Sequence, residues 1–214
     1  MIALAVLMLL GGGNTNPWQE VRNKDGITVW ARDVPGSPIR EVRAEMVVEI
    51  PAERVWAVLV DVPSYLEFMP YLVEASVIGP AGANAQYEYQ LIDPPIVDRR
   101  DYVLKVNFEE QDGYYRRSWR PANGVGPAPR EDVVRLSICE GSWTVERRED
   151  GRTSVTYWLY TDPGGAIPNF IANKANTTSV PDLMAAVRRA NVMANERSRL
   201  VEFSAKDGVL TLSG

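Results

Sequence analysis

The sequence has no histidine and only one cysteine, and these two absences exclude several kinds of chemistry. Without an imidazole there is no Ser-His-Asp or Cys-His nucleophilic site and no zinc site that uses histidine. Cys139 alone can form neither a disulfide within the chain nor a multi-cysteine metal site. Any catalysis would depend on carboxylates, tyrosine, lysine or arginine, and we expect no catalytic residues, metal or cofactor.

An excess of positive charge is also missing. The 214 residues include 23 Lys and Arg against 28 Asp and Glu, which gives a formal net charge of -5. Nucleic-acid binding relies on clustered basic side chains, so it is excluded as the main function. The length predicts a single domain with an ample core, and a hydrophobic content of 45% argues against general disorder.

The longest apolar run is short and lies at the N-terminus. Residues 1–10, MIALAVLMLL, are all apolar but too few to cross a bilayer. The run has the length of a signal-peptide h-region, although a basic n-region and a clear cleavage site are missing. A sequence that starts too late would explain the missing basic residues. We expect residues 1–17 to be a secretory signal or its remnant and the protein to be periplasmic or extracellular; a frayed N-terminus of a cytoplasmic protein is the alternative.

The pattern after residue 25 predicts two strands, two short helices and then a long series of strands. Residues 26–34 and 39–50 alternate or are rich in β-branched residues, as strands are. Pro51 suits the first turn of a helix, whose apolar residues recur at helical spacing before Pro63. A second short helix, SYLEFM, follows. Turn signals then separate predicted strands at residues 72–78, 86–92, 101–109, 114–120, 133–137, 142–148 and 153–160.

The remainder of the chain predicts a C-terminal helix. Two groups of apolar residues mark it: Ile167, Phe170 and Ile171, and then Val180, Leu183, Met184 and Val187. Pro181 is expected to kink or divide the helix. Residues 195–214 are weakly periodic and predict a loose tail or hairpin. This order gives an α+β fold in which a curved antiparallel sheet wraps around the last helix and leaves a ligand cavity between them.

Several stretches resemble the START family of lipid-binding domains, within the Bet v 1-like helix-grip superfamily. Residues 94–106, PPIVDRRDYVLKV, are similar to the family's proline-containing loop and Arg-Asp-aromatic-Val strand start. Residues 156–174, TYWLYTDPGGAIPNFIANK, resemble its last strand, Asp-Pro-Gly-Gly turn and helix entry. The matches occur in the family's order. The resemblance implies a START-like domain over residues 18–194, with a hydrophobic tunnel that holds a sterol, phospholipid or other lipid.

Arg100 stands in the stretch that resembles the family's Arg-Asp motif. The resemblance implies that its guanidinium points into the tunnel and binds a ligand's polar head through charge-assisted hydrogen bonds. A salt bridge to Asp98, Asp101 or an acid on a neighbouring strand is the alternative. Glu88, on the preceding strand, is a candidate counter-charge for Arg100. A slip of one residue in register exchanges the two faces of a strand, so either Glu88 or Tyr89 faces the tunnel.

The remaining candidate ligand-binding residues are aromatic or apolar. Tyr102, Trp119 and Tyr157 lie on predicted strands and would give the tunnel apolar walls with a few hydroxyl groups; core packing is the alternative for each. The inner face of the C-terminal helix is expected to include Phe170, Ile171, Leu183, Met184 and Val187, in contact with either a ligand or the sheet.

These observations favour a non-catalytic lipid carrier that takes a hydrophobic ligand, contacts membranes transiently and acts as a monomer. An enzyme of the polyketide cyclase or aromatase type is the alternative, because a fold does not fix a function. Its acid and base groups would have to be residues such as Glu88, Asp98, Tyr89 or Arg100. A module that senses a lipid or presents it to a protein partner is a third option.

Overall fold

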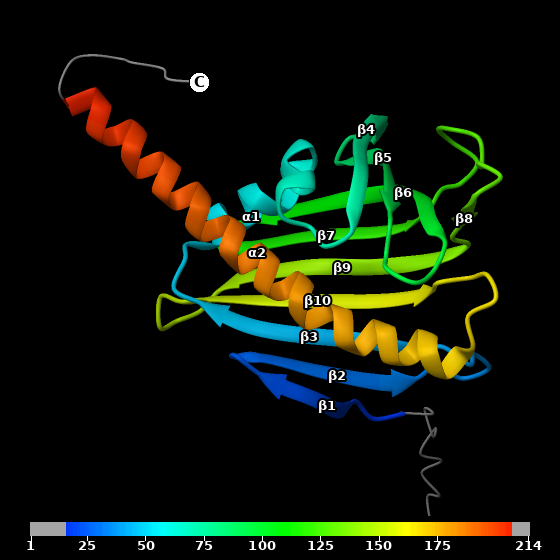
Figure 1. The fold of residues 1–214 in the computed structure, drawn as a ribbon. Coiled ribbons are helices and arrows are strands. Elements are labelled where there is room, and N and C mark those ends of the chain that lie inside the picture. The colour runs from blue at the N-terminus through cyan, green and yellow to red at the C-terminus, as the bar shows by residue number, and fades with distance from the viewer. Residues whose placement is uncertain (1–15, 207–214) are drawn as a thin grey trace, which may run out of the picture.

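The structure of the protein is a computed structural model that describes residues 16–206, with side chains described as far as residue 193. Residues 1–15 of the expected export segment and residues 207–214 of the expected tail lie outside this range. One ten-stranded sheet carries two short helical segments and a long C-terminal helix (Figure 1), which confirms the predicted α+β helix-grip fold. The strands are β1 (Gln19–Lys24), β2 (Ile27–Asp33), β3 (Arg40–Val48), β4 (Leu72–Gly82), β5 (Ala85–Ile92), β6 (Arg99–Gln111), β7 (Tyr114–Pro121), β8 (Val133–Arg135), β9 (Ile138–Arg147) and β10 (Thr153–Asp162).

The strands follow the order β1-β2-β3-β10-β9-β7-β6-β5-β4, so that β1 and β4 are the edges of the sheet. Neighbours along this path are antiparallel, and β8 pairs in parallel with the start of β6. Tight turns with positive φ angles join several neighbours, for example at Asp25, Gly26 and Gly151. Gly adopts such angles freely and Asp tolerates them. The turn signals in the sequence mark these strand ends for that reason.

Three strands differ from the predictions: β9 begins four residues earlier than predicted, and the other two, β1 and β4, are edge strands. The sequence pattern does not predict β1, because its residues QEVRNK include a single apolar one; the strand forms by pairing with β2. β4 runs through Gly79 and Pro80, which the sequence suggested to be a turn. Register shifts on both sides of this dipeptide show that the strand is bulged there. Proline is tolerated at bulges and on edge strands because no second neighbour needs its missing N–H group.

Two short helical segments connect β3 to β4, as expected. They are α1 (Ala52–Val60) and the 3-10 helix η1 (Val62–Glu67). Pro51 precedes α1, where the missing N–H group of proline costs no helical hydrogen bond. α1 buries Trp56 and Leu59, and η1 buries Tyr65. These residues place both segments on the face of the sheet that also carries the C-terminal helix (Figure 1).

The C-terminal helix, α2 (Asn169–Lys206), is a single helix that Pro181 does not divide. The helix also continues beyond residue 194, so the predicted loose tail is wrong for residues 195–206. Residues 193–206, MANERSRLVEFSAK, are rich in Ala, Glu, Arg and Leu, which favour helix even without a clear apolar stripe. None of the described helices has an apolar stretch long enough to cross a membrane.

A large core cluster joins α2 and α1 to β2, β3, β9 and β10. α2 packs mainly against β2, β3, β10 and α1. Inward-facing residues of these strands, such as Val29 and Val42, meet Met184 and Val187 of α2. Alternation along each strand delivers these side chains to one face. The candidate site lies beside this cluster, between α2 and the inner face of β5, β6, β7, β9 and β10.

Candidate ligand-binding site

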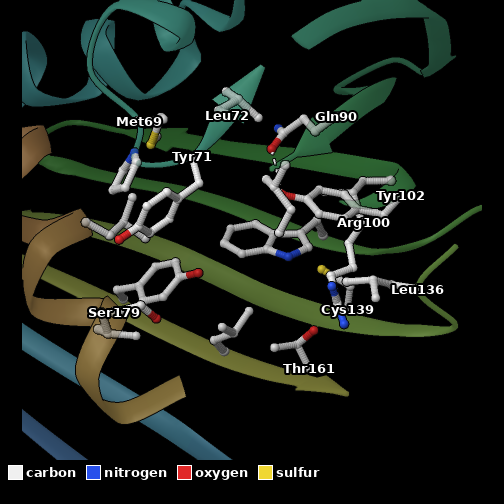
Figure 2. A pocket seen from close by; sticks show the side chains of 18 of the residues that line it. Met69, Tyr71, Leu72, Gln90, Arg100, Tyr102, Leu136, Cys139, Thr161 and Ser179 are labelled. Carbon is white, nitrogen blue, oxygen red and sulfur yellow. Dashed lines mark hydrogen bonds between the residues drawn. The ribbon is translucent and has the colours of Figure 1, made fainter. Parts of the chain in front are cut away.

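A cavity of about 260 Å³ lies between α2, the segment that joins η1 to β4, and the inner face of β5, β6, β7, β9 and β10. Figure 2 shows Arg100, Cys139 and Thr161 gathered at one end of it and Tyr71 and Ser179 at the other. Tyr71 is 51% exposed and Ser179 is also exposed. The cavity therefore reaches solvent between the start of β4 and α2.

The wall of the cavity is mainly apolar and has few polar groups. Strand alternation brings Tyr102 and Leu104 of β6 and Leu159 of β10 to the same face. The Tyr102 hydroxyl donates a hydrogen bond to Oε1 of Gln90 at 3.0 Å. Burial raises the pKa of the Tyr102 and Tyr157 phenols, so both stay neutral. Among the described residues, no group of three or more His, Cys, Asp or Glu side chains could hold a metal ion.

Arg100 is a nearly completely buried cation in this wall, with 3% of its surface exposed. Its Nε donates to the carbonyl oxygen of Pro163 at 3.2 Å, and its Nη1 donates to that of Asp98. No carboxylate of the described residues forms an ion pair with it, and Asp101 pairs with Arg135 instead. Burial lowers the pKa of Arg100, but arginine stays charged in proteins. The Asp98 carboxylate acts on Arg100 at longer range and offsets part of this lowering of the pKa. The cavity therefore contains a positive charge with which no carboxylate of the described residues forms an ion pair.

A second arginine of the wall, Arg117, pairs with Glu88. Their side chains are 3% and 0% exposed. Nη2 of Arg117 contacts the Glu88 carboxylate, and Nη1 donates to the Leu59 carbonyl at 2.9 Å and contacts the Tyr65 hydroxyl. Burial raises the pKa of Glu88 to about 7 and lowers that of Arg117 to about 9, because it disfavours both charged forms. The Nε of Arg117 is buried and has no hydrogen-bond partner among the described residues.

The structure brings together some of the predicted site residues and separates others. Those that line the cavity are Arg100, Tyr102, Trp119, Tyr157 and Leu183, whose role in binding a ligand stays a prediction. Glu88 faces the same side but lies behind the wall, where it contacts Arg117 and not Arg100. Met184 and Val187 are fully buried in the core cluster that α2 forms with α1 and the sheet. Of the two alternatives for these helix residues, contact with the sheet is the one observed.

Tyr89 faces the opposite side of the sheet, so its expected place in the tunnel wall is wrong. Because side chains alternate along a strand, the inward position of Glu88 turns Tyr89 outward. There Tyr89 packs with Val103 and donates a hydrogen bond to Asp101 at 3.2 Å. Asp101 also accepts two hydrogen bonds from Arg135, at 2.6 and 2.8 Å. This buried pair joins β8 to β6.

Phe170 and Ile171 are 74% and 44% exposed, so the expectation that they lie on the inner face of α2 is wrong. The reason is helical phase. The buried stripe of the first turns contains Ala172, Asn176 and Val180, spaced four residues apart. Phe170 precedes Ala172 by two residues, which is about 200° around the helix. Its apolar side chain therefore points away from the sheet.

Sequence reasoning missed Arg117, Tyr65 and Gln90 as members of this site. For Arg117 a signal was available, because it lies between Tyr115 and Trp119 at a spacing of two on the same strand face. Gln90 lies two residues from Glu88 on β5, so it faces the same side of the sheet once the register is known. Tyr65 gave no signal, since its contact with Arg117 depends on how η1 folds over the sheet.

A curved antiparallel sheet that grips a long C-terminal helix, with a mainly apolar cavity between the two, defines the START-like class of helix-grip proteins, a fold that supports lipid binding. The chain belongs to the family described as polyketide cyclase/dehydrase and lipid transport, whose model matches residues 48–188. The resemblance to START domains seen in the sequence is thereby confirmed.

Three similar proteins show how close the sequence and structural similarity is. The chain is 28% identical to an uncharacterized protein of Pseudomonas aeruginosa over 175 residues, which are 81% of this chain and 86% of that protein. It is also 28% identical to a STAR-related lipid transfer protein fragment of Xanthomonas axonopodis, whose structure matches with a TM-score of 0.73 over 81% of this chain and 98% of the fragment. Human STARD10 has the same fold, with a TM-score of 0.78 and 20% identity over 85% of this chain and 76% of that chain.

Proposed function

We propose that the protein binds a lipid with an acidic head group in its cavity and carries it between membranes without changing it chemically. The observation that carries this proposal is the buried Arg100 in a mainly apolar wall. Its hydrogen-bond partners among the described residues are backbone carbonyls, and the Asp98 carboxylate acts on it only at longer range, so a carboxylate or phosphate in the cavity could form an ion pair with it. Membership of a family that includes lipid transport supports the proposal, as does the similarity to a STAR-related lipid transfer protein.

The two parts of such a ligand would be recognised differently. The acidic head would accept hydrogen bonds from Arg100, which fixes the orientation of the lipid. The apolar part would lie against side chains such as Leu104, Leu159 and Leu183. Burial of apolar surface contributes roughly 25 cal/mol per Å² and would supply most of the affinity.

Transfer also requires contact with a membrane, and we assign this role to apolar side chains that project into solvent. Ile96, in the loop between β5 and β6, is fully exposed, and Phe170 is 74% exposed. The loop leads directly into Arg100, and Phe170 follows the turn that contains Pro163, the hydrogen-bond partner of Arg100. Exposed apolar groups of this kind partition into a lipid interface. Export, which the apolar residues 1–10 suggest, would place the protein among the membranes of the cell envelope.

The test is to purify the protein from its native host, extract it with organic solvent and identify the extracted lipids by mass spectrometry. We expect an acidic lipid in the wild-type extract and a large loss of it in Arg100→Gln. Arg99→Gln is the matched control, because the neighbouring Arg99 is half exposed and pairs with Asp93 outside the cavity. An empty wild-type extract, together with no uptake from vesicles of phosphatidylglycerol and phosphatidylcholine, would contradict the proposal.

An enzyme of the polyketide cyclase type is the second candidate, because the family description includes cyclases. The pKa of Glu88, about 7, also suits a proton donor or acceptor near neutral pH. Glu88 lies behind the cavity wall, however, and its carboxylate is engaged by Arg117 and Gln86. Turnover of a poly-β-keto thioester that Glu88→Gln abolishes would favour the enzyme. Binding of this thioester without turnover would favour the carrier.

A further inference from the structure

Trp119 lies midway between the two ends of the cavity. In the sheet it stands opposite Gly141 of β9. Cys139, two residues from Gly141, belongs to the end that contains Arg100 (Figure 2). Gly141 pairs with Leu159 of β10. Two residues from Leu159, on the side away from Arg100, Tyr157 contributes to the wall. A ligand that extends from Arg100 toward Tyr157 must therefore pass the side chain of Trp119.

Gly141 determines where the indole of Trp119 lies. A Cβ atom at position 141 would be 2.3 Å from Cζ2 of Trp119 and 2.6 Å from the carbonyl oxygen of Trp158. The indole therefore rests directly on the backbone of β9, in space that any other residue at position 141 would occupy. This contact sets how far the indole extends into the cavity.

Further contacts keep the indole in this position. Its ring centroid is 6.0 Å from that of Tyr157, with a tilt of 34° between the planes. The guanidinium of Arg117 lies 6.0 Å from the indole and is itself held by Glu88 and Tyr65. A side chain held on several sides is a fixed part of the wall, because other rotamers would lose these contacts.

The size of the cavity makes this position important for ligand choice. A volume of about 260 Å³ is slightly below the range of roughly 300–1,000 Å³ that pockets for drug-sized ligands span. The indole is the bulkiest side chain that a protein can place in such a space. A flexible unbranched chain can bend around a fixed ring in the middle of a cavity, whereas a rigid fused-ring body cannot.

We propose that Trp119 limits the size of the ligand, so that the cavity accepts a single unbranched acyl chain and excludes a sterol body. This inference rests on the proposed function, because it concerns the lipid that the cavity binds. A smaller side chain at position 119 would widen the cavity between its two ends, since Gly141 behind it contributes no side chain. Residue 119 is then the position that determines the specificity of the site.

Palmitate and lithocholate test this inference, because each has one carboxylate and they differ in the apolar body. Their affinities would be measured by isothermal titration calorimetry for the wild type, Trp119→Phe, Trp119→Leu and Trp119→Ala. We expect the ratio of lithocholate affinity to palmitate affinity to rise as the side chain becomes smaller, by about tenfold or more for Trp119→Ala. Trp30→Leu is the control. Trp30 lies on the outer face of β2, away from the cavity, so its replacement should leave the ratio unchanged.

The possible outcomes separate this inference from the proposed function. Thermal unfolding identifies the variants that are folded, and Trp119→Phe keeps a ring against Tyr157 if the smaller replacements unfold. Palmitate binding with an unchanged ratio in the folded variants overturns the size limit and leaves the carrier function standing. The same holds if Trp30→Leu raises the ratio equally. If neither carboxylate binds to the wild type or to any variant, the acidic-lipid carrier and the size limit are both wrong.

Discussion

The carboxylate of Glu88 contacts the guanidinium of Arg117 at a place where neither side chain is more than 3% exposed. Removing two charges from water costs free energy that their mutual attraction must offset, and in protein interiors this cost can exceed the attraction. The pKa of Glu88 is raised to about 7 and that of Arg117 is lowered to about 9, and burial is the main cause of both shifts. Burial therefore dominates over attraction at this pair.

The first prediction is that Glu88 makes the stability of the protein depend on pH. The folded-state pKa of about 7 lies above the ordinary value of 4.5, so the folded protein binds the proton more tightly than the unfolded chain. The contribution of Glu88 is then fully present below pH 4.5 and is lost as the pH rises through about 7. The wild type should lose stability relative to Glu88→Gln over this range in urea denaturation. A relative gain would show that attraction to Arg117 outweighs burial.

The second prediction concerns the buried pair on the other face of the sheet. Asp101→Ala removes the acceptor of the Tyr89 hydroxyl and leaves Arg135 without its carboxylate partner, although Arg135 keeps its hydrogen bond to the Pro127 carbonyl. We expect a loss of about 3 to 5 kcal/mol in the free energy of unfolding. Glu74→Ala is the control, because the Glu74–Arg130 pair is 45% and 42% exposed and such surface pairs contribute about 1 kcal/mol or less. Similar losses in the two variants would contradict this assignment. Chemical denaturation of both variants measures the difference.

Much of the fold could be predicted because strand alternation and helical spacing are local patterns. The Glu88–Arg117 pair could not, because it reaches across β6. Glu88 stands opposite Leu104 of β6, and Arg117 stands opposite Phe108 of the same strand. Such a contact depends on the register of three strands and on the length of the arginine side chain, which no local pattern contains.

The errors at the start of α2 have a different cause. Phe170 and Ile171 are apolar, which by itself favours the inner face of α2. Their positions around the helix relative to the buried Ala172 and Val180 place them on its outer face instead. The predicted placement of Arg100 rests on the resemblance to START domains and agrees with its position in the wall. The number and kind of its partners followed only from the structure.

The third prediction is that the shape of the Arg100 side chain matters as well as its charge. A guanidinium offers several N–H groups in one plane, so it can bind the carbonyls of Asp98 and Pro163 and still face a ligand. The ammonium group of lysine lacks this planar fork and cannot make the same set of contacts. A hydrogen bond to a charged group contributes roughly 1.5 to 3 kcal/mol, so Arg100→Lys is expected to weaken palmitate binding by about tenfold or more, as calorimetry would measure. Arg99→Lys should have no effect; wild-type affinity in Arg100→Lys would mean that charge alone suffices.

The fourth prediction concerns membrane contact. Ile96 and Phe170 expose apolar side chains on segments that adjoin Arg100 and its partner Pro163. Burial of one such side chain stabilises a complex by about 1.5 to 3 kcal/mol, so Ile96→Ser combined with Phe170→Ser should reduce vesicle binding at least about tenfold. Sedimentation with phosphatidylcholine vesicles measures the bound fraction, while extraction checks that the cavity still holds its lipid. Val47→Ser is the control, because Val47 is 41% exposed on the outer face of β3. If the double variant binds vesicles as well as Val47→Ser does, the protein approaches membranes through another surface.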